Sequence, residues 1–188
     1  MDNDAADDTA GIDKPQTPSH LLTLCMGSKD NPEAVKEALQ EADANVNING
    51  REKSSGQTPL MAATLRGMAL TVELLLESGA DPTIGEKQGY TPAHGAGFQG
   101  QTAVMRVLKK YNLDLNDFHA DGNSPFHRAC WGRTERHAEL VRYMVEDGGV
   151  DVNLPSNEGQ TCMQMTSNAM TKEVLRTLGA VETDAQEL

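Results

Sequence analysis

The sequence predicts an all-α array of stacked helix pairs, and three observations support this fold class. A phrase of Gly, any residue, Thr or Ser, Pro and an apolar residue returns along the chain at a nearly constant spacing. An amphipathic segment follows each copy in the same phase. Aromatic residues make up only 4% of the chain, which fits a core of Leu, Val, Ala and Met. Units of this period bury their apolar faces only by stacking on one another.

The recurring phrase is clearest at Gly56–Met61, Gly89–His94 and Gly122–His127. Gly159–Gln164 is a copy without Pro, and Thr17–His20 is a copy without the Gly. The Thr or Ser of the copies stands at positions 17, 58, 91, 124 and 161, so the steps are 41, 33, 33 and 37 residues. The first and fourth units are therefore longer than the others.

Each unit carries the start and stop signals of two helices. The Thr or Ser before Pro caps the free N–H groups of a first helix, and Pro has the backbone angle of a first helical turn. A Gly marks the turn into a second helix, which ends at a residue that tolerates the left-handed conformation. The expected turn residues are Gly67, Gly100 and Gly132, the expected end residues are Gly79, Asn112 and Gly148, and the expected second helices are 33–39, 71–78, 104–110, 138–146 and 173–178.

The period and the Thr-Pro-x-His phrase together resemble the ankyrin repeat family, over residues 17–181. The resemblance implies an ankyrin-repeat solenoid, curved, with projecting β-turn fingers that serve as a binding surface, and it implies no enzymatic activity. We expect acidic, flexible tails at 1–16 and 182–188. The unit that starts at 161 has lost Pro and His, as expected of a terminal cap.

Charge and cysteine content exclude several classes of partner and site. The formal net charge is −12, which argues against nucleic acid and anionic membranes as partners. No apolar run is long enough to span a bilayer, and the acidic start of the chain lacks the pattern of a signal peptide. The three cysteines are Cys25, Cys130 and Cys162, an odd number at wide spacings. We expect no disulfide framework and therefore a reducing, intracellular location, in the cytoplasm or the nucleus.

The histidines and cysteines offer little chemistry. The resemblance gives His20, His94 and His127 a structural role, bridging the Thr or Ser of their own phrase and neighbouring backbone. His127, Cys130 and His137 form a closer group, but zinc usually needs four ligands at matched spacing, so a zinc site is disfavoured. No phosphate loop, metalloprotease helix or nucleophile elbow occurs. We expect no catalytic residue, metal or cofactor.

Asn47, Asn116 and Asn153 each follow an apolar residue after a second helix. The resemblance implies that such asparagines stabilise the turn there. Some asparagines at this position in the family are substrates of asparaginyl hydroxylases, so hydroxylation is a second hypothesis. An intact mass without an added oxygen would count against it.

The resemblance also indicates which residues touch a partner, because partners of this family contact the finger tips and the exposed ends of the first helices. Aromatic residues and Arg dominate interface energetics, so Tyr90, Phe98 and Trp131 are the leading candidates. Two readings of Phe98 and Trp131 stay open, because they either contact a partner or cover the groove between helices. The insertion at 133–136 adds local positive charge and is a candidate specificity loop. The predicted contact residues are Leu65, Arg66, Lys87, Gln88, Tyr90, Phe98, Gln99, Asp121, Asn123, Trp131, Arg133, Glu158 and Gln160.

These observations favour a non-enzymatic adaptor or regulator that binds another protein and is monomeric when unbound. The alternative is a structural subunit built permanently into a larger assembly. A chain that is stable alone favours the adaptor, whereas one that is insoluble without its partner favours the subunit.

Overall fold

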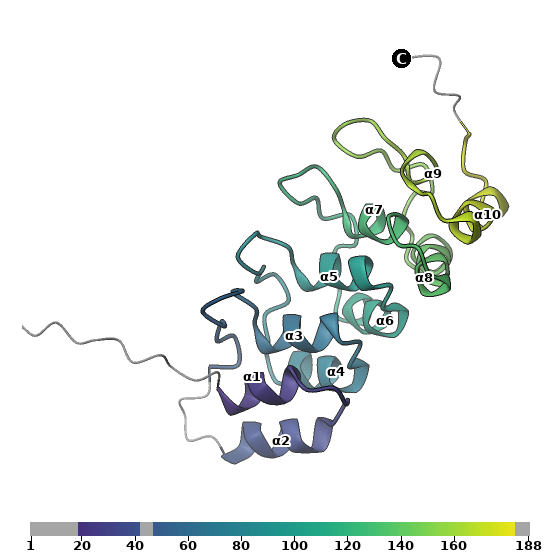
Figure 1. Cartoon of the computed structure of the whole chain (residues 1–188). Helices are drawn as coiled ribbons and strands as arrows, with labels where there is room; N and C mark the ends of the chain where they lie inside the picture. Colours follow the sequence, from purple (N-terminus) through teal and green to yellow (C-terminus); the bar gives the residue numbers. More distant parts are fainter. Residues whose placement is uncertain (1–18, 42–46, 183–188) are drawn as a thin grey trace, which may run out of the picture.

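The computed structural model describes residues 19–41 and 47–182, and within these it contains ten helices and no strand (Figure 1). The first expected unit start, Thr17, and the expected tails at 1–16 and 182–188, apart from Glu182, lie outside the described residues. The helices are α1 His20–Cys25, α2 Pro32–Glu41, α3 Pro59–Leu65, α4 Ala69–Glu77, α5 Pro92–Gln99, α6 Thr102–Lys110, α7 Pro125–Cys130, α8 Glu135–Glu146, α9 Cys162–Met165 and α10 Ala169–Thr177.

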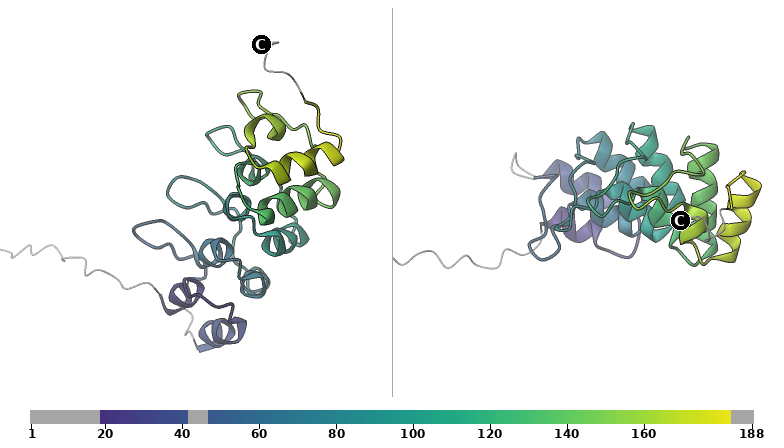
Figure 2. Two further views of the ribbon diagram at one scale, coloured as in Figure 1. Left: turned by 45° about the vertical axis from the view of Figure 1, so that its right-hand side comes forward. Right: turned by 90° about the horizontal axis from the view of Figure 1, so that it is seen from above.

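The helices stack in two rows, which confirms the predicted solenoid. The first helices α1, α3, α5, α7 and α9 form one row, and the second helices α2, α4, α6, α8 and α10 form the other (Figure 1). The fingers between repeats project from the side of the first helices, and the left view of Figure 2 shows them as separate loops. One apolar core runs through all repeats, from Leu21 to Leu175. We call the surface formed by the fingers and the first helices the inner face.

The phrase residues cap α3, α7 and α9 as the sequence predicts, but Thr91 makes no capping hydrogen bond at α5. Thr58 Oγ1 accepts a hydrogen bond of 3.1 Å from Met61 N, and Pro59 begins α3. Ser124 and Thr161 form capping boxes at α7 and α9. The first unit differs, because its N-cap is Ser19, whose Oγ accepts from Leu22 N at 3.2 Å. Helix α1 therefore begins two residues later in the phrase than expected.

The turns after the helices follow the prediction with one correction. Asn112 is left-handed with φ 60°, as expected, but after α8 the left-handed residue is Gly149 with φ 78° and not Gly148. Gly132 lies in the turn between α7 and α8, as predicted, but it is not left-handed as Gly67 and Gly100 are. A Cβ at Gly132 would overlap the ring of His137, so this glycine provides space rather than an unusual backbone angle.

The expectation of no disulfide is wrong, because Cys130 and Cys162 form one. Cys130 is the last residue of α7, and Cys162 is the first residue of α9, where the other phrases have Pro. Their wide separation of 32 residues is about one repeat, and stacking brings their Cα atoms to 5.5 Å, which a disulfide spans without distortion. Cys25 is a free, buried thiol, and burial raises its pKa to about 12.

None of the helices within 19–41 and 47–182 combines the length and apolar character needed to cross a bilayer.

Candidate functional site

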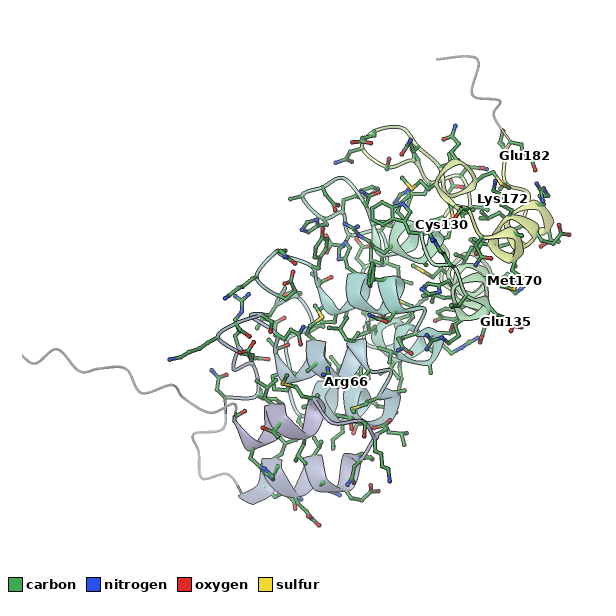
Figure 3. All side chains as sticks on the ribbon, in the orientation of Figure 1. Arg66, Cys130, Glu135, Met170, Lys172 and Glu182 are labelled. Carbon is green, nitrogen blue, oxygen red and sulfur yellow. A yellow bond between two sulfur atoms is a disulfide. The ribbon has the colours of Figure 1, made fainter. Side chains whose placement is uncertain are left out.

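A groove of about 330 Å³ opens on the inner face, between the fingers and the helices α3 and α5. Its floor comes from the first helices, and its rim comes from two successive fingers and from α7. In Figure 3, Arg66 marks the end of α3, and the labelled Glu135, Met170 and Lys172 lie with the second helices, away from the fingers. The groove is lined by Gln57, Met61, Leu65, Glu86, Gln88, Tyr90, His94, Gly95, Phe98 and Arg128.

The floor of the groove is hollow because of a glycine. A Cβ on Gly95 would lie 3.1 Å from Leu65 Cδ2 and 3.1 Å from Met61 Sδ, so any side chain there would fill the space between them. Phe98 stands at the end of the same helix with 59% of its surface exposed. The groove thus has an apolar floor and an exposed aromatic ring at its edge.

Arg128 forms the wall of the groove and is held between two aromatic rings. Its guanidinium carbon lies 4.6 Å from the ring centroid of Tyr90 and 4.5 Å from that of Trp131. Nη2 donates to the Tyr90 hydroxyl at 3.0 Å and to the carboxylate of Asp121. Only 7% of Arg128 is exposed, so this cation depends on its rings and its carboxylate for stabilisation.

Asp121 connects the tip of one finger to this arginine. Partial burial opposes ionisation of Asp121, but the hydrogen bonds that its carboxylate accepts from Tyr90, Asn123 N and Arg128 hold its pKa well below its usual value. Burial, together with the hydrogen bond from its hydroxyl to Asp121, raises the pKa of Tyr90. The cluster therefore contains an ionised carboxylate and a neutral phenol.

His119 joins two neighbouring fingers. Its ring stacks on Tyr90 with centroids 3.8 Å apart, and Nε2 lies 2.7 Å from the carbonyl oxygen of Gln88. Because a carbonyl only accepts, Nε2 carries the proton in this contact. Nδ1 can then accept from Asp121 N, at 3.2 Å. Elsewhere a backbone hydrogen bond joins the fingers, from Lys87 N to Ser55 O or from Asn157 N to Gly122 O.

The thirteen predicted contact residues lie on the inner face, but only some of them meet at the groove. Leu65, Gln88, Tyr90 and Phe98 line it. Trp131 is 42% exposed and packs on the adjacent Arg128. Arg66, Lys87, Gln88, Phe98, Asp121, Trp131, Arg133, Glu158 and Gln160 are exposed, and Leu65, Tyr90, Gln99 and Asn123 are partly buried.

Sequence reasoning missed Arg128 and His119, although both left a signal. Arg128 occupies the position that is Ala62 and Gly95 in the preceding phrases, so a long cation stands in a slot for small residues. His119 occupies the finger position of Glu86, and in both cases the side chain accepts from the backbone N–H two residues later. The clue for Arg128 was a residue that breaks the pattern of its slot, and the clue for His119 was a polar finger side chain that supports the backbone two residues later.

His127, Cys130 and His137, the closer group in the sequence, each have a partner within the protein. His127 Nδ1 lies 2.9 Å from Ser124 Oγ, and Nε2 lies 3.0 Å from Leu154 O, which confirms the predicted bridge. His137 contacts Thr134 Oγ1 and the carbonyl of Phe98. No group of three or more metal-ligating side chains occurs within the described part of the chain.

His94 makes only half of the expected bridge. Nδ1 lies 2.8 Å from Thr91 Oγ1, but Nε2 has no hydrogen-bond partner among the described residues. His20 does not occupy the bridging position at all, because it is the exposed first residue of α1.

The asparagines act in the turns, with a change of register. The backbone N–H groups of Asn49, Asn116 and Asn153 each donate a hydrogen bond to the side chain two residues earlier. Asn49, and not Asn47, is therefore the residue equivalent to Asn116 and Asn153. Asn47 instead matches Asp114 and Asp151. Asn49 Oδ1 accepts from Asp81 N at 2.9 Å, and Asn153 Oδ1 accepts from Val181 N at 2.8 Å, so both tie their turn to the next repeat.

Comparison with known proteins agrees with this architecture. A family model described as Ankyrin repeats (3 copies) matches residues 4–86, 21–119 and 67–156. Similar curated proteins include Palmitoyltransferase AKR1 of Lachancea kluyveri, 23% identical over 185 residues, which covers 79% of this chain and 24% of the relative. E3 ubiquitin-protein ligase Ufd4 of Drosophila melanogaster is 32% identical over 129 residues, 68% of this chain and 4% of the relative. Rabankyrin-5 of Mus musculus is 32% identical over 97 residues, 50% of this chain and 8% of the relative.

The chain spans a quarter or less of the length of these relatives. The similarity therefore covers a repeat region that larger proteins of different activities share.

Proposed function

The chain belongs to the ankyrin repeat family, and from that premise we propose that it is a non-enzymatic adaptor or regulator that binds a partner protein through its inner face. Repeats of this family generally mediate protein–protein interaction and are typically non-catalytic. The observation that carries the proposal is the groove beside Phe98, whose hollow apolar floor and exposed ring have the composition of an interface core. Trp131 and Arg128 extend the same surface.

Affinity capture with the full chain as bait tests the proposal. The double variant Phe98→Ala/Trp131→Ala removes the exposed rings of the inner face, and it should lose partners that the unaltered chain retains. Its thermal unfolding should change little, because both rings are substantially exposed, with only the stacking of Trp131 on Arg128 lost.

Leu70→Ala provides a matched control. Leu70 is a large apolar residue with 60% of its surface exposed, and it lies near the start of α4, in the row of second helices. This variant should keep the partners of the unaltered chain. Loss of the same proteins from both variants, or from neither, would contradict binding through the inner face.

A further inference from the structure

We propose that the groove receives an acidic peptide segment of the partner, in which one large apolar side chain fills the floor and a neighbouring carboxylate accepts hydrogen bonds from the wall. This inference rests on the proposed function and adds the chemistry of the partner. Three independent observations carry it: unmatched donors in the groove, the distribution of charge over the chain, and the shape of the floor.

The first observation is a pair of buried donors without acceptors. Arg128 Nε and His94 Nε2 have no hydrogen-bond partner among the described residues, although the two side chains are only 7% and 2% exposed and both line the groove. An unpaired buried polar group costs free energy, so a ligand that pairs it gains affinity.

The state of His94 follows from its counterpart in the next repeat. At His127, Ser124 N donates to Nδ1 and Nε2 faces the carbonyl of Leu154, so Nδ1 accepts and Nε2–H donates. His94 holds the same place in its phrase, with Nδ1 against Thr91 Oγ1. Burial lowers the pKa of His94, which keeps the ring neutral and leaves Nε2–H as a donor. Arg128 Nε–H is a donor at any pH. The groove therefore offers two donors and calls for an acceptor such as a carboxylate.

The second observation is that the inner face carries more basic than acidic residues in an acidic protein. The whole chain has 28 acidic and 16 basic residues. The fingers at 51–57, 84–90, 117–123 and 154–160, together with α3, α5, α7 and the loops that follow them, carry six basic and five acidic residues. Their basic residues are Arg51, Lys53, Arg66, Lys87, Arg128 and Arg133, and their acidic residues are Glu52, Glu86, Asp117, Asp121 and Glu158.

Most of these carboxylates are already engaged within the protein. Glu52 accepts from Ser54 and Ser55, Glu86 accepts from the backbone of Gln88 and Tyr90, and Asp121 pairs with Arg128. By contrast, the side chains of Lys87 and Arg133 make no ion pair or hydrogen bond within the part of the chain that the structure describes. Glu52 and Glu86 keep their charge, because their donors are neutral, whereas Lys87 and Arg133 are exposed cations without a counterion among the described residues. These two positive charges are offered to a partner, and complementary charge favours an acidic segment beside them.

The third observation is the floor itself. Leu65, Met61 and Phe98 surround the space that Gly95 leaves open, and about 330 Å³ is enough for one large apolar side chain with adjoining backbone. An acidic segment without such a side chain would leave the apolar floor exposed to water. The occupant must therefore combine one bulky apolar residue with neighbouring Asp or Glu.

Selection from a displayed library of random linear peptides tests the proposal, with the full chain as target. Groove dependence is judged by loss of binding to Gly95→Leu, which fills the floor, and to Phe98→Ser, which serves if the first variant unfolds. We expect groove-dependent peptides that share one bulky apolar residue next to Asp or Glu. Groove-dependent peptides with a neutral or basic consensus, or the absence of any groove-dependent peptide, would overturn the acidic occupant. Neither result touches the proposed function, which the Phe98/Trp131 capture experiment tests separately.

A titration of the selected peptides checks the charge. Lys87→Glu/Arg133→Glu should bind about tenfold more weakly, since reversing exposed charges weakens each contact modestly. Lys36→Glu/Lys172→Glu makes the same change of net charge on the second helices α2 and α10, away from the inner face, and should bind within about twofold of the unaltered chain. Replacing the peptide's Asp and Glu by Asn and Gln should weaken binding to a similar extent. Equal losses in the two double variants would contradict a role for the inner-face charge.

Discussion

At the scale of single residues, the inner face depends on one buried cation. Arg128 has two rings, one phenol hydroxyl and one carboxylate around it, and the carboxylate is the only full charge among these contacts. A residue of this kind stabilises the fold only while its counterion is present, because removing one partner of a buried pair leaves an uncompensated charge. The same residue forms a wall of the groove, so stability and binding meet at one side chain.

Asp121→Asn tests this dependence. The variant keeps an acceptor for the Tyr90 hydroxyl but removes the charge, and we expect the free energy of unfolding at neutral pH to fall by about 1–3 kcal/mol. Asp121 has a lowered pKa in the folded chain, so its contribution is present above the ordinary value of 3.8 and is lost as the pH falls through the folded pKa. The difference between the variant and the unaltered chain should therefore shrink in acid.

Urea unfolding in neutral and acidic buffer measures the effect of Asp121→Asn. Glu158→Gln is its matched control, because Glu158 stands at the equivalent position of the next finger and is exposed. A loss as large in the control as in Asp121→Asn would count against the pairing with Arg128.

The buried histidines predict a second dependence on pH. Burial lowers the pKa of His94 and of His127 below the ordinary 6.5, so the unfolded chain binds protons more readily than the folded chain. The stability that the neutral rings contribute is present above about pH 6.5 and is lost as the pH falls through the lower folded values. Urea unfolding near pH 7.5 and near pH 5.5 should give a smaller free energy at the lower pH. An equal free energy at both would show that the rings are not buried in neutral form.

At the scale of elements, α5 and α7 pack closely against one another. A Cβ on Gly97 would overlap the carbonyl oxygen of Pro125 and would lie 3.2 Å from Arg128 Cβ, so the two helices meet through a glycine. Gly95, two residues earlier on α5, instead faces the ends of flexible side chains. The two glycines of one helix therefore have different tasks, one for packing and one for the groove.

Gly97→Ala and Gly95→Ala separate these tasks. Overlap with backbone cannot relax easily, so Gly97→Ala should lower the free energy of unfolding by about 2 kcal/mol or more. Gly95→Ala should be neutral or stabilising by up to about 1 kcal/mol, because Ala favours the helix and Met61 and Leu65 can shift into the groove. Urea unfolding of the two variants side by side measures the difference, and similar losses in both would contradict this assignment.

The boundaries of the second helices show where sequence reasoning stops. The apolar pattern predicts the second helices but starts them late, at 71 for α4 and at 173 for α10, which begin at Ala69 and Ala169. The signal for α4 lies in another repeat, because Asp30 accepts from Leu70 N and Thr71 N at 3.0 Å. Sequence rules predict a helix start from the capping residue that precedes it. Met68, the N-cap of α4, makes no side-chain hydrogen bond, so these rules do not detect the start of α4.

At the scale of the whole molecule, the fixed period of the repeats makes most of the fold predictable. Contacts that depend on particular residues in two neighbouring repeats are not predictable from the period. Stacking places equivalent residues of neighbouring repeats together, so the inner face could be predicted by phase alone. The same stacking brings Cys130 to Cys162, although their distance in sequence suggested separation. The groove depended on Gly95 and Arg128 occupying equivalent slots in adjacent repeats, a combination that no single unit displays.

The disulfide predicts how the array unfolds. Among the described helices the α9–α10 pair packs on one neighbouring repeat, as the α1–α2 pair does, so it should open more readily than the inner repeats in an array held by nearest-neighbour contacts. The Cys130–Cys162 bond ties this pair to α7 and closes a loop with a separation of 32 residues, which should stabilise the chain by about 2–4 kcal/mol. Reduction should therefore lower the midpoint of urea unfolding and increase hydrogen exchange in α9 and α10 before α3 or α5.

Cys162→Ala removes the bond without a reductant and should reproduce the effect of reduction, whereas Cys25→Ala leaves the bond intact. Cys25 is buried, so its truncation also lowers stability, but through a cavity at the opposite end of the stack. Reductant should then shift the midpoint of Cys25→Ala as it does in the unaltered chain, and it should leave that of Cys162→Ala unchanged. A disulfide that restrains the unfolded chain stabilises the protein, so its reduction should lower the midpoint of unfolding. If reductant shifts the midpoint of none of the three proteins, the Cys130–Cys162 bond does not stabilise the terminal repeat.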